Sequence, residues 1–398
     1  MTKSSSLSSR PAARQGRLLY AILIAVIVAA GLSQGLLLPL LSVMLEKQGV
    51  SASLNGLNAA ALYIGSFSMT LISERVLGAV GFKKLIAAGT ALVTVSLLLF
   101  PVFPDVKVWF LLRFLVGIGD AAINYAAQLW VLLMTPAEHR GRNLSFYGMS
   151  YGLGFSLGPA GIGLLRFGES VPFFVLTVIF VIALVLALRY LPDSKPEKGE
   201  EDAAQSRRFR RSYALAWYAL LPALLYGYME ASLNSGFPVY GLRIGYAESQ
   251  IAALLPFAGI GGLLLQLPLG LLSDRFGRKK VLMAAGIGGG AAFVLLPAAG
   301  DRFGVTLVLL LLAGGLVGSF FSLGLAYAAD ILPRTLLPAA NVVASFHFNA
   351  GSIVGPGIGG TLLESGTGGG AFILLGALYI VFGLAGFLYT PRVPGKGV

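Results

Sequence analysis

Two polar stripes at helical spacing interrupt long apolar runs of this chain. In the run 107–134, Arg113 and Asp120 are seven residues apart, about two helical turns, so they share one face. Steps of four lead on to Asn124 and Gln128, which makes the edge polar along its length. The acid and the base are either a static pair, each lowering the cost of burying the other, or a proton site. In the second case Asp120 takes up a proton when Arg113 moves away.

A second stripe lies in the run 214–240, where Tyr226, Glu230 and Asn234 follow one another at spacing four. Within one turn of Glu230 on its own helix there is no cation. A carboxyl in such a setting favours its neutral form, which suits reversible proton binding. The alternative is a carboxyl hydrogen-bonded at the outer water boundary, because the run ends near Tyr240.

The elements that hold these stripes are expected to span a membrane. Of the 398 residues, 56% are hydrophobic and 12% are charged, whereas soluble domains are about 45–50% apolar and about 25% charged. This composition excludes a water-soluble enzyme and a disordered chain. The chain has no cysteine and two histidines, His139 and His347, which leaves no thiolate chemistry and too few ligands for a His-rich metal site. We expect no metal and no cofactor.

Twelve runs are long and apolar enough for a transmembrane helix. An even number places both termini on one side, and 23 of the 29 Lys and Arg residues lie on that side, which is therefore cytoplasmic. The net charge of +12 thus reflects membrane orientation, and no nucleic-acid partner is expected. The expected spans are 18–44, 55–74, 84–102, 107–134, 143–166, 171–191, 214–240, 248–272, 279–299, 303–329, 337–362 and 370–390.

The middle of the chain holds a polar segment in which five acids precede four arginines, and it separates six runs from six. It is expected to be a solvated linker. The sequence therefore predicts a cytoplasmic tail, a six-helix bundle, a cytoplasmic linker, a second six-helix bundle and a cytoplasmic tail, at 1–17, 18–192, 193–213, 214–390 and 391–398.

Both halves carry the same patterns of glycine, proline and lysine, which indicates a duplication. A Gly-x3-Gly-Pro pattern recurs at an offset of 197, and a Gly-x-Lys-Lys pattern recurs at an offset of 196. Glycines one turn apart allow helix backbones to approach closely, and proline bends a helix. Two like halves are typical of an alternating-access carrier with its site between them at the midplane. The residues expected to pack or kink helices are Gly154, Gly158, Pro159, Gly351, Gly355 and Pro356.

At these motifs the chain resembles a known family. The segment 270–280, GLLSDRFGRKK, resembles the loop signature of the major facilitator superfamily, with its Gly, Asp, Arg and Lys positions filled. Arg113-x3-Gly117-x-Gly119 is similar to the family's motif in the fourth span. The Gly-Pro pattern of the fifth span resembles the antiporter motif of drug:proton members, and the general pattern is similar to that of YcaD-like bacterial transporters. The resemblance implies an all-α membrane fold of twelve helices in two pseudo-symmetric six-helix bundles.

The resemblance also implies roles for residues, and the first half departs from the pattern. Asp274 is implied to pair with arginines at the cytoplasmic end and so to latch the outward-facing state, with membrane anchoring as the alternative. The first copy has Gly78 in place of Asp274, Phe82 in place of Arg278, and Ile162 in place of a glycine. The expected gate residues are Gly270, Asp274, Arg275, Gly277 and Arg278.

The expected protein is a secondary active transporter that exports a small amphipathic or cationic molecule in exchange for protons. We expect a monomer among the lipids of a bacterial plasma membrane. Proton-coupled nutrient uptake and proton-independent handling or sensing of an amphiphile are the alternatives. An ATP-driven pump is disfavoured, because the chain has no Gly-x4-Gly-Lys-Ser/Thr motif. Proton coupling is expected at Arg113, Asp120 and Glu230, and the substrate cavity at Gln34, Asn124, Gln128, Tyr226, Asn234 and Tyr327.

Overall fold

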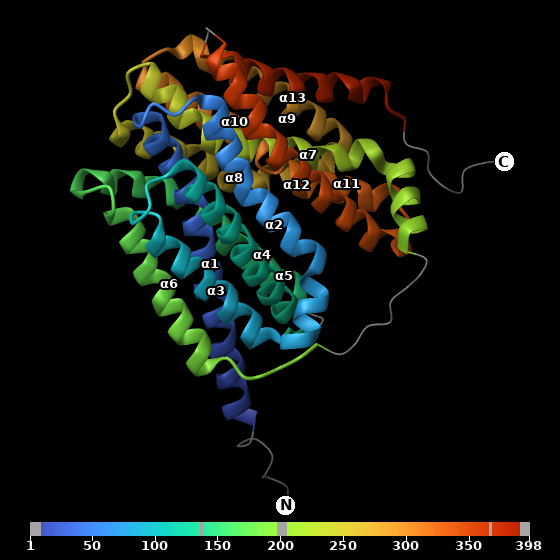
Figure 1. The fold of residues 1–398 in the computed structure, drawn as a ribbon. Helices are drawn as coiled ribbons and strands as arrows, with labels where there is room; N and C mark the ends of the chain where they lie inside the picture. The colour runs from blue at the N-terminus through green and yellow to red at the C-terminus, as the bar shows by residue number, and fades with distance from the viewer. Residues whose placement is uncertain (1–8, 136–138, 197–204, 366–367, 391–398) are drawn as a thin grey trace, which may run out of the picture. The chain divides into compact units, whose positions relative to one another are not determined.

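The computed structural model describes residues 9–135, 139–196, 205–365 and 368–390, and its regular secondary structure in these ranges is helical (Figure 1). The all-α prediction is thereby confirmed. The α-helices are α1 (Ser9–Lys47), α2 (Ala52–Val80), α3 (Phe82–Leu99), α4 (Val106–Met134), α5 (Arg140–Leu157), α6 (Val171–Tyr190), α7 (Gln205–Arg243), α8 (Glu248–Phe276), α9 (Arg278–Leu295), α10 (Phe303–Val317), α11 (Phe320–Ile331), α12 (Leu337–Glu364) and α13 (Gly370–Leu388). Short 3₁₀ helices occupy η2 (Gly158–Phe167), η3 (Leu296–Ala299) and η4 (Arg334–Leu336).

Eight helical segments of the described chain are long and apolar enough, by themselves, to cross a membrane. The other four expected spans correspond to α4, α5 with η2, α7 and α12. These four carry the polar stripes or the Gly-Pro patterns. Polar residues inside a span must face other helices or a cavity, which agrees with the burial of Arg113 and Asp120 on α4 and of Glu230 and Asn234 on α7.

The helix bounds repeat with the offset that the sequence shows. The helices α1, α2 and α3 have 39, 29 and 18 residues, and α7, α8 and α9 have the same lengths at positions 196 residues later. The equivalent residues Gly81 and Gly277 have φ angles of 86° and 94°. Only glycine adopts this backbone region readily, so a single residue suffices to turn the chain between consecutive helices.

The two copies differ at their later helices. The helix α4 is continuous, whereas its counterpart is interrupted at Gly318 and Ser319 and forms α10 and α11. Conversely, the α-helical part of the fifth span ends at Gly158 and continues as the 3₁₀ helix η2 with Pro159 in its first turn, whereas α12 runs through Pro356. The same Gly-Pro pattern therefore ends an α-helix in one half and is accommodated inside one in the other half.

The helices group into two compact units. Unit 1 is Met1–Gln34, Gly65–Gly158 and Leu164–Lys198, and unit 2 is Gly35–Ile64, Pro159–Gly163 and Gly199–Val398. In unit 1, α3 packs against α4 and α6. In unit 2, α7 packs along α12, α9 along α13 and α8 along α10 (Figure 1). The division into bundles at the linker 193–213 stays a prediction; residues 197–204 lie outside the described ranges, and α7 already begins at Gln205.

Candidate functional site

Pairs of glycines bring helix backbones into direct contact in each unit. One pair is Gly31 on α1 and Gly154 on α5, and the other is Gly227 on α7 and Gly351 on α12. A Cβ atom added to any of the four would collide with the backbone of the facing helix. The two pairs occupy equivalent positions of the repeat. Backbones this close leave no room for lipid or for mobile side chains between them. Gln34 and Glu230 each lie three residues beyond the first glycine of a pair, so both side chains begin inside the packed region.

Gln34 is 8% exposed in unit 1, and its side-chain Oε1 accepts a hydrogen bond from the hydroxyl of Tyr151 on α5. At the offset of 196, Gln34 corresponds to Glu230. The first copy therefore has a neutral amide where the second copy has a carboxyl. The sequence predicts that Gln34 lines a cavity. In the structure its side chain is hydrogen-bonded to Tyr151 of a neighbouring helix.

Glu230 is 8% exposed in unit 2, and its carboxyl accepts a hydrogen bond from the hydroxyl of Tyr226, one turn earlier on α7. The Asn234 side-chain amide donates 2.8 Å to the backbone oxygen of Glu230, so this donor is already used by its own helix. Tyr379 on α13 donates 3.0 Å to the backbone oxygen of Leu225. Tyr226, Glu230 and Asn234 thus lie together, and Tyr226 is the polar side chain that meets the carboxyl directly.

Arg113 and Asp120 on α4 are both buried in unit 1, with exposed fractions of 0% and 4%. Neither carboxyl oxygen of Asp120 has a hydrogen-bond partner among the described residues. The neighbouring Gly119 lies against Gly89 of α3 so closely that a Cβ on either would collide with the other's backbone oxygen. Tight packing therefore holds Asp120 in the interior without supplying a polar partner, which a structural acid would have.

The rest of the α4 stripe divides into a bonded part and an open part. The Asn124 side-chain amide donates 3.1 Å to the backbone oxygen of Asp120, and the Tyr147 hydroxyl of α5 donates 3.1 Å to the backbone oxygen of Asn124. Gln128, one turn further on, is exposed. Asn124 therefore joins α4 to α5, and Gln128 is the end of the stripe that solvent or lipid reaches.

Tyr327 on α11 is 7% exposed, and its hydroxyl has no hydrogen-bond partner among the described residues. It belongs to unit 2, as does the Tyr226 and Glu230 pair, while Arg113, Asp120, Asn124, Gln128 and Gln34 belong to unit 1. Among the described residues, each unit therefore holds one buried carboxyl and at least one other buried polar group. In the described part of the chain, no cluster of three or more His, Asp or Glu residues is arranged to hold a metal ion.

The signature loop between α8 and α9 forms its ion pairs within unit 2. The Arg278 guanidinium lies 3.3 Å from the Asp274 carboxylate and 2.8 Å from that of Asp330 on α11. The Arg275 guanidinium lies 5.4 Å from the ring centroid of its neighbour Phe276. Asp330 is a partner that the loop signature does not reveal. Because both carboxylates are more than half exposed, each pair contributes about 0–1 kcal/mol, a strength suited to a contact that is made and broken.

The corresponding loop of the first copy is anchored by an aromatic contact. Phe82, which stands where the second copy has Arg278, is 1% exposed and stacks on Trp130 of α4 with ring centroids 5.0 Å apart. The backbone nitrogen of Phe82 also donates 2.9 Å to the backbone oxygen of Ser194, at the start of the linker. The departure from the motif therefore replaces an exchangeable ion pair with a fixed apolar contact.

A charged network that the sequence analysis missed lies on the predicted outer side, within unit 2. Arg243 at the end of α7 donates 2.6 and 3.2 Å to Glu46 of α1 and 2.9 Å to the backbone oxygen of Leu363 on α12. The Lys47 ammonium lies 2.7 Å from the carboxylate of Glu248 on α8. We call these contacts the outer network. Its members are far apart in the sequence and belong to no motif, so only the fold could reveal them.

Replacing Arg243 with Gln is expected to loosen the outer network. A pair of this exposure contributes about 1 kcal/mol, so the end of α7 should separate from α1 about five times more often. The reporter is a cysteine at position 52, where Ala52 is 2% exposed in a chain without native cysteine. Its rate of labelling by a membrane-impermeant thiol reagent should rise accordingly.

The control is Lys107→Gln, which removes an exposed cation on the same predicted side and should leave labelling unchanged. The double variant Glu46→Arg with Arg243→Glu should restore the slow rate. An unchanged rate in Arg243→Gln, or a swapped pair that labels as fast as the single variant, would show that the pair does not hold this end closed.

The same end of unit 2 should respond to acid through Glu364, which follows Leu363 of the outer network and lies beyond the predicted span 337–362. Glu364 accepts hydrogen bonds from the Ser53 hydroxyl at 2.5 Å and from its backbone nitrogen at 3.1 Å, and these hold the pKa of Glu364 below its usual value of 4.5. Because the charged form is the one stabilised, the contact persists above that value and is lost as the pH falls through the lowered pKa. The labelling rate at position 52 is divided at each pH by the rate of a cysteine at the exposed position 107, because the reactive thiolate becomes scarce in acid. This ratio should stay low from neutral pH to about 4.5 and rise only below it. In Glu364→Gln this acid-dependent rise should be absent; a rise that remains would assign it to another group.

Comparison with known proteins gives a consistent picture. The family model described as Major Facilitator Superfamily matches residues 23–263 and 212–398. The chain is 39% identical over 349 residues to the uncharacterized MFS-type transporter YfkF of Bacillus subtilis, covering 87% of this chain and 89% of that protein. It is 28% identical over 263 residues to Multidrug resistance protein 1 of the same organism, covering 65% and 66%.

More distant similarity covers most of the chain as well. The uncharacterized MFS-type transporter YcaD of Salmonella enteritidis is 21% identical over 330 residues, covering 82% of this chain and 84% of that protein. Among solved structures, the D-xylose-proton symporter superposes with a TM-score of 0.75 at 16% sequence identity, covering 96% of this chain and 99% of that one. At this identity the superposition shows a shared fold.

Proposed function

The chain belongs to the Major Facilitator Superfamily and is a multi-pass membrane transporter, and on that premise we propose that it exports a small amphipathic or cationic molecule in exchange for protons. It works by alternating access in the plasma membrane of a bacterium, as a monomer with both termini in the cytoplasm. Bacterial relatives support the membrane, and the excess of basic residues on one side of the predicted spans supports the orientation.

The observation that carries the proposal is the pair of buried carboxyls, Asp120 and Glu230. A charged group inside a membrane protein is expensive, so an acid without a fixed cation is retained for a function. Asp120 has no hydrogen-bond partner among the described residues, and the Glu230 carboxyl is met by the hydroxyl of Tyr226. Each carboxyl is neutral when protonated, and the anionic form of each is stabilised by a nearby cation. That cation is Arg113 or a cationic substrate for Asp120, and a cationic substrate for Glu230.

Proton exchange then follows from competition at one carboxyl. An anionic carboxyl attracts a cationic substrate, and a protonated carboxyl does not, so proton uptake favours substrate release. Tyr226 donates to the Glu230 carboxyl and Tyr327 offers a buried hydroxyl without a partner, so both are placed to hydrogen-bond a ligand in unit 2. Arg113 is a buried cation on the same helix, and Asp120 takes up a proton when Arg113 moves away from it.

Two sets of exchangeable ion pairs support alternating access. The outer network joins α1, α7, α8 and α12, and Arg278 joins α9 to α11 through Asp330. Contacts of about 1 kcal/mol or less can be broken by the differential binding energy of a ligand. We propose that the outer network closes the outer end while the inner end is open and that the loop around Arg278 latches the inner end in the opposite state.

The direction of transport rests on relatives. The named relatives include Multidrug resistance protein 1, a name that fits export of foreign amphiphiles. Similarity to a D-xylose-proton symporter shows only the fold. The first copy of the Gly-Pro pattern has Ile162 in place of a glycine, which leaves uptake as the outcome that the experiment must distinguish.

The test is a pH-gradient assay in sealed proteoliposomes that contain the purified chain. Lipophilic cations, neutral drugs, sugars and amino acids are added one at a time, and the internal pH and the compound are both measured. Export by proton exchange predicts that lipophilic cations dissipate an inside-acid gradient while they accumulate inside. Movement of a compound in the same direction as protons would establish uptake by symport instead, and movement without proton flux would refute coupling.

A further inference from the structure

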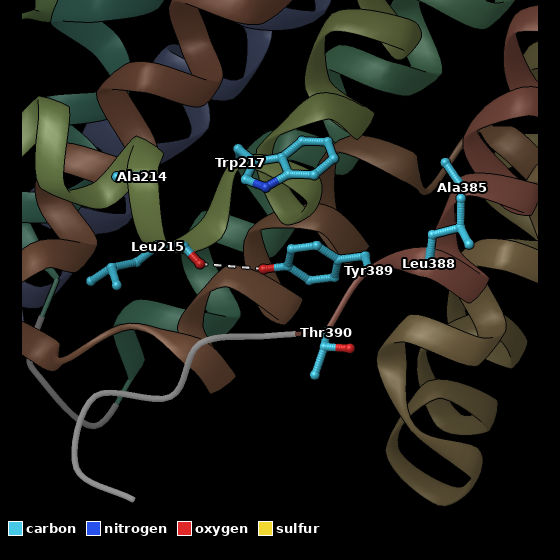
Figure 2. A pocket seen from close by; sticks show the side chains of 7 residues that line it. All are labelled: Ala214, Leu215, Trp217, Ala385, Leu388, Tyr389 and Thr390. Carbon is cyan, nitrogen blue, oxygen red and sulfur yellow. Dashed lines mark hydrogen bonds between the residues drawn. The ribbon is translucent and has the colours of Figure 1, made fainter. Parts of the chain in front are cut away.

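A cavity of about 650 Å³ lies in unit 2 at the ends of α7 and α13, on the predicted cytoplasmic side (Figure 2). Its wall is made of apolar and aromatic side chains together with two hydroxyl groups, from Ala214, Leu215, Trp217, Ala385, Leu388, Tyr389 and Thr390. It lies apart from the buried carboxyls, and the proposed transport cycle makes no use of it.

The cavity is built by a break in α7. Ala216 has non-helical angles, φ −130° and ψ 25°, at the centre of the lining segment 214–217. The Tyr389 hydroxyl donates 3.2 Å to the backbone oxygen of Leu215, beside this break, as Figure 2 shows. The Trp217 ring packs edge-on against Tyr389, with ring centroids 5.4 Å apart. The opening is therefore held by a backbone feature and a specific hydrogen bond, which indicates a formed site.

Basic residues lie beside the residues that line the cavity. The Lys279 ammonium donates 2.5 Å to the backbone oxygen of Tyr389 and lies 5.8 Å from the centroid of its ring. On the segment of α7 that precedes the break, the exposed residues Arg208, Arg210 and Arg211 lie within two turns of Leu215. Basic residues at a membrane surface attract anionic lipids, whose phosphate groups lie at the same depth.

An apolar track leads from the cavity along α13. Val381, Leu384 and Leu388 have exposed fractions of 63%, 52% and 89% and recur at spacings of three and four, so they form one exposed stripe. Leu388 belongs both to the stripe and to the cavity wall. A ligand that matches both features has an anionic head group, which the arginines attract, and an acyl chain, which packs along this stripe.

We propose that this cavity binds an anionic phospholipid of the cytoplasmic leaflet. The lipid phosphate lies by Lys279, Arg210 and Arg211, its glycerol region occupies the cavity beside Trp217, and one acyl chain follows α13. The leaflet assignment rests on the orientation proposed above; the recognition chemistry does not. The bound lipid ties the segment before the break in α7 to the end of α13.

The structure supplies its own reporter for a test. Trp217 is 39% exposed and lines the cavity, whereas Trp109 and Trp130, which complete the three tryptophans of the chain, are 0% and 5% exposed. Lipids with brominated acyl chains quench tryptophan on contact. The protein is reconstituted in phosphatidylcholine, and brominated phosphatidylglycerol or brominated phosphatidylcholine replaces part of it in increasing fractions. Trp217→Phe supplies the signal of the two buried tryptophans, which is subtracted.

We expect half-maximal quenching at a lower fraction of phosphatidylglycerol than of phosphatidylcholine. Each arginine contributes about fivefold to the preference for phosphatidylglycerol over phosphatidylcholine. In the double variant Arg210→Gln with Arg211→Gln this preference should therefore be about 25-fold lower. Arg189→Gln is the matched control, because Arg189 is an exposed arginine on the same predicted side at the end of α6. This variant should keep the full preference.

Equal quenching by the two lipids in the unaltered protein would overturn the proposal, as would an equal loss in the Arg189 control. Glycerol phosphate in solution separates a lipid from a free phosphate. If it displaces the brominated lipid at millimolar concentration, the site recognises a soluble phosphate, and the lipid proposal is wrong. None of these outcomes bears on proton exchange, which is measured separately with the pH-gradient assay.

Discussion

Replacing Asp120 with Asn is expected to abolish substrate-dependent proton flux without lowering the stability of the protein. The amide has nearly the same shape as the carboxyl but cannot exchange a proton. Asp120 is 4% exposed and has no hydrogen-bond partner among the described residues, so no native hydrogen bond is lost in the variant. A buried polar group left unsatisfied costs about 1–3 kcal/mol, and Asp120→Leu should therefore raise the melting temperature.

The measurement pairs the pH-gradient assay with thermal unfolding in detergent. Glu169→Gln is the control, because it removes an exposed acid outside the buried stripes and should leave both readings unchanged. A static structural role predicts the opposite pattern, namely retained flux and a lower melting temperature. Glu230→Gln is measured beside it, and if this variant alone abolishes proton flux, the exchange site is assigned to Glu230 and Tyr226.

Replacing Gly351 with Ala is expected to destabilise the protein by about 3 kcal/mol, although the change adds only one methyl group. The new Cβ would collide with the backbone oxygen of Leu224 and the backbone nitrogen of Tyr228 on α7. Backbone atoms inside a helix cannot rotate away as a flexible side chain can. The helices α7 and α12 would have to separate along their contact, with loss of the packing that buries Glu230.

Gly357→Ala on the same helix is the matched control. A Cβ there would meet only the Cδ2 atom of Leu57 at 3.8 Å, an ordinary contact. Alanine has the higher helix propensity by about 1 kcal/mol, so this variant should be as stable as the unaltered protein or slightly more so. Equal melting temperatures for the two variants would show that α7 and α12 can separate without cost.

The sequence predicts the features that depend on periodicity or on repeated residues. The polar stripes follow from spacings of four, and the lengths of α1 to α3 and α7 to α9 repeat at the offset found in the glycine patterns. The position of Gly277 in a tight turn follows from its place between two apolar runs, and its φ of 94° agrees. Such features are local, so the residues that produce them are neighbours in the chain.

Partners across helices could not be predicted, because packing between distant segments selects them. Arg278 has acids near it in the sequence, yet its shorter contact is with Asp330 on another helix. Arg243 pairs with Glu46, 197 residues away. The spacing of seven residues predicts that Asp120 and Arg113 share a face of α4. It does not predict that no described residue donates a hydrogen bond to the Asp120 carboxyl, because this depends on the side chains of the neighbouring helices, including α3 beside Gly119.

The paired glycines also limit how the chain can deform. Where α5 meets α1 and α12 meets α7, main chain rests on main chain, so there is no layer of side chains to shear or to change rotamer. Each helix pair is therefore expected to move as one rigid body when a ligand binds. Bending is expected where the helices are already interrupted, at Gly158 after α5, at Ala216 in α7 and at Gly318 between α10 and α11. The duplicated glycines thus predict which helix pairs of the transporter move as rigid bodies, and the interruptions predict where the helices bend.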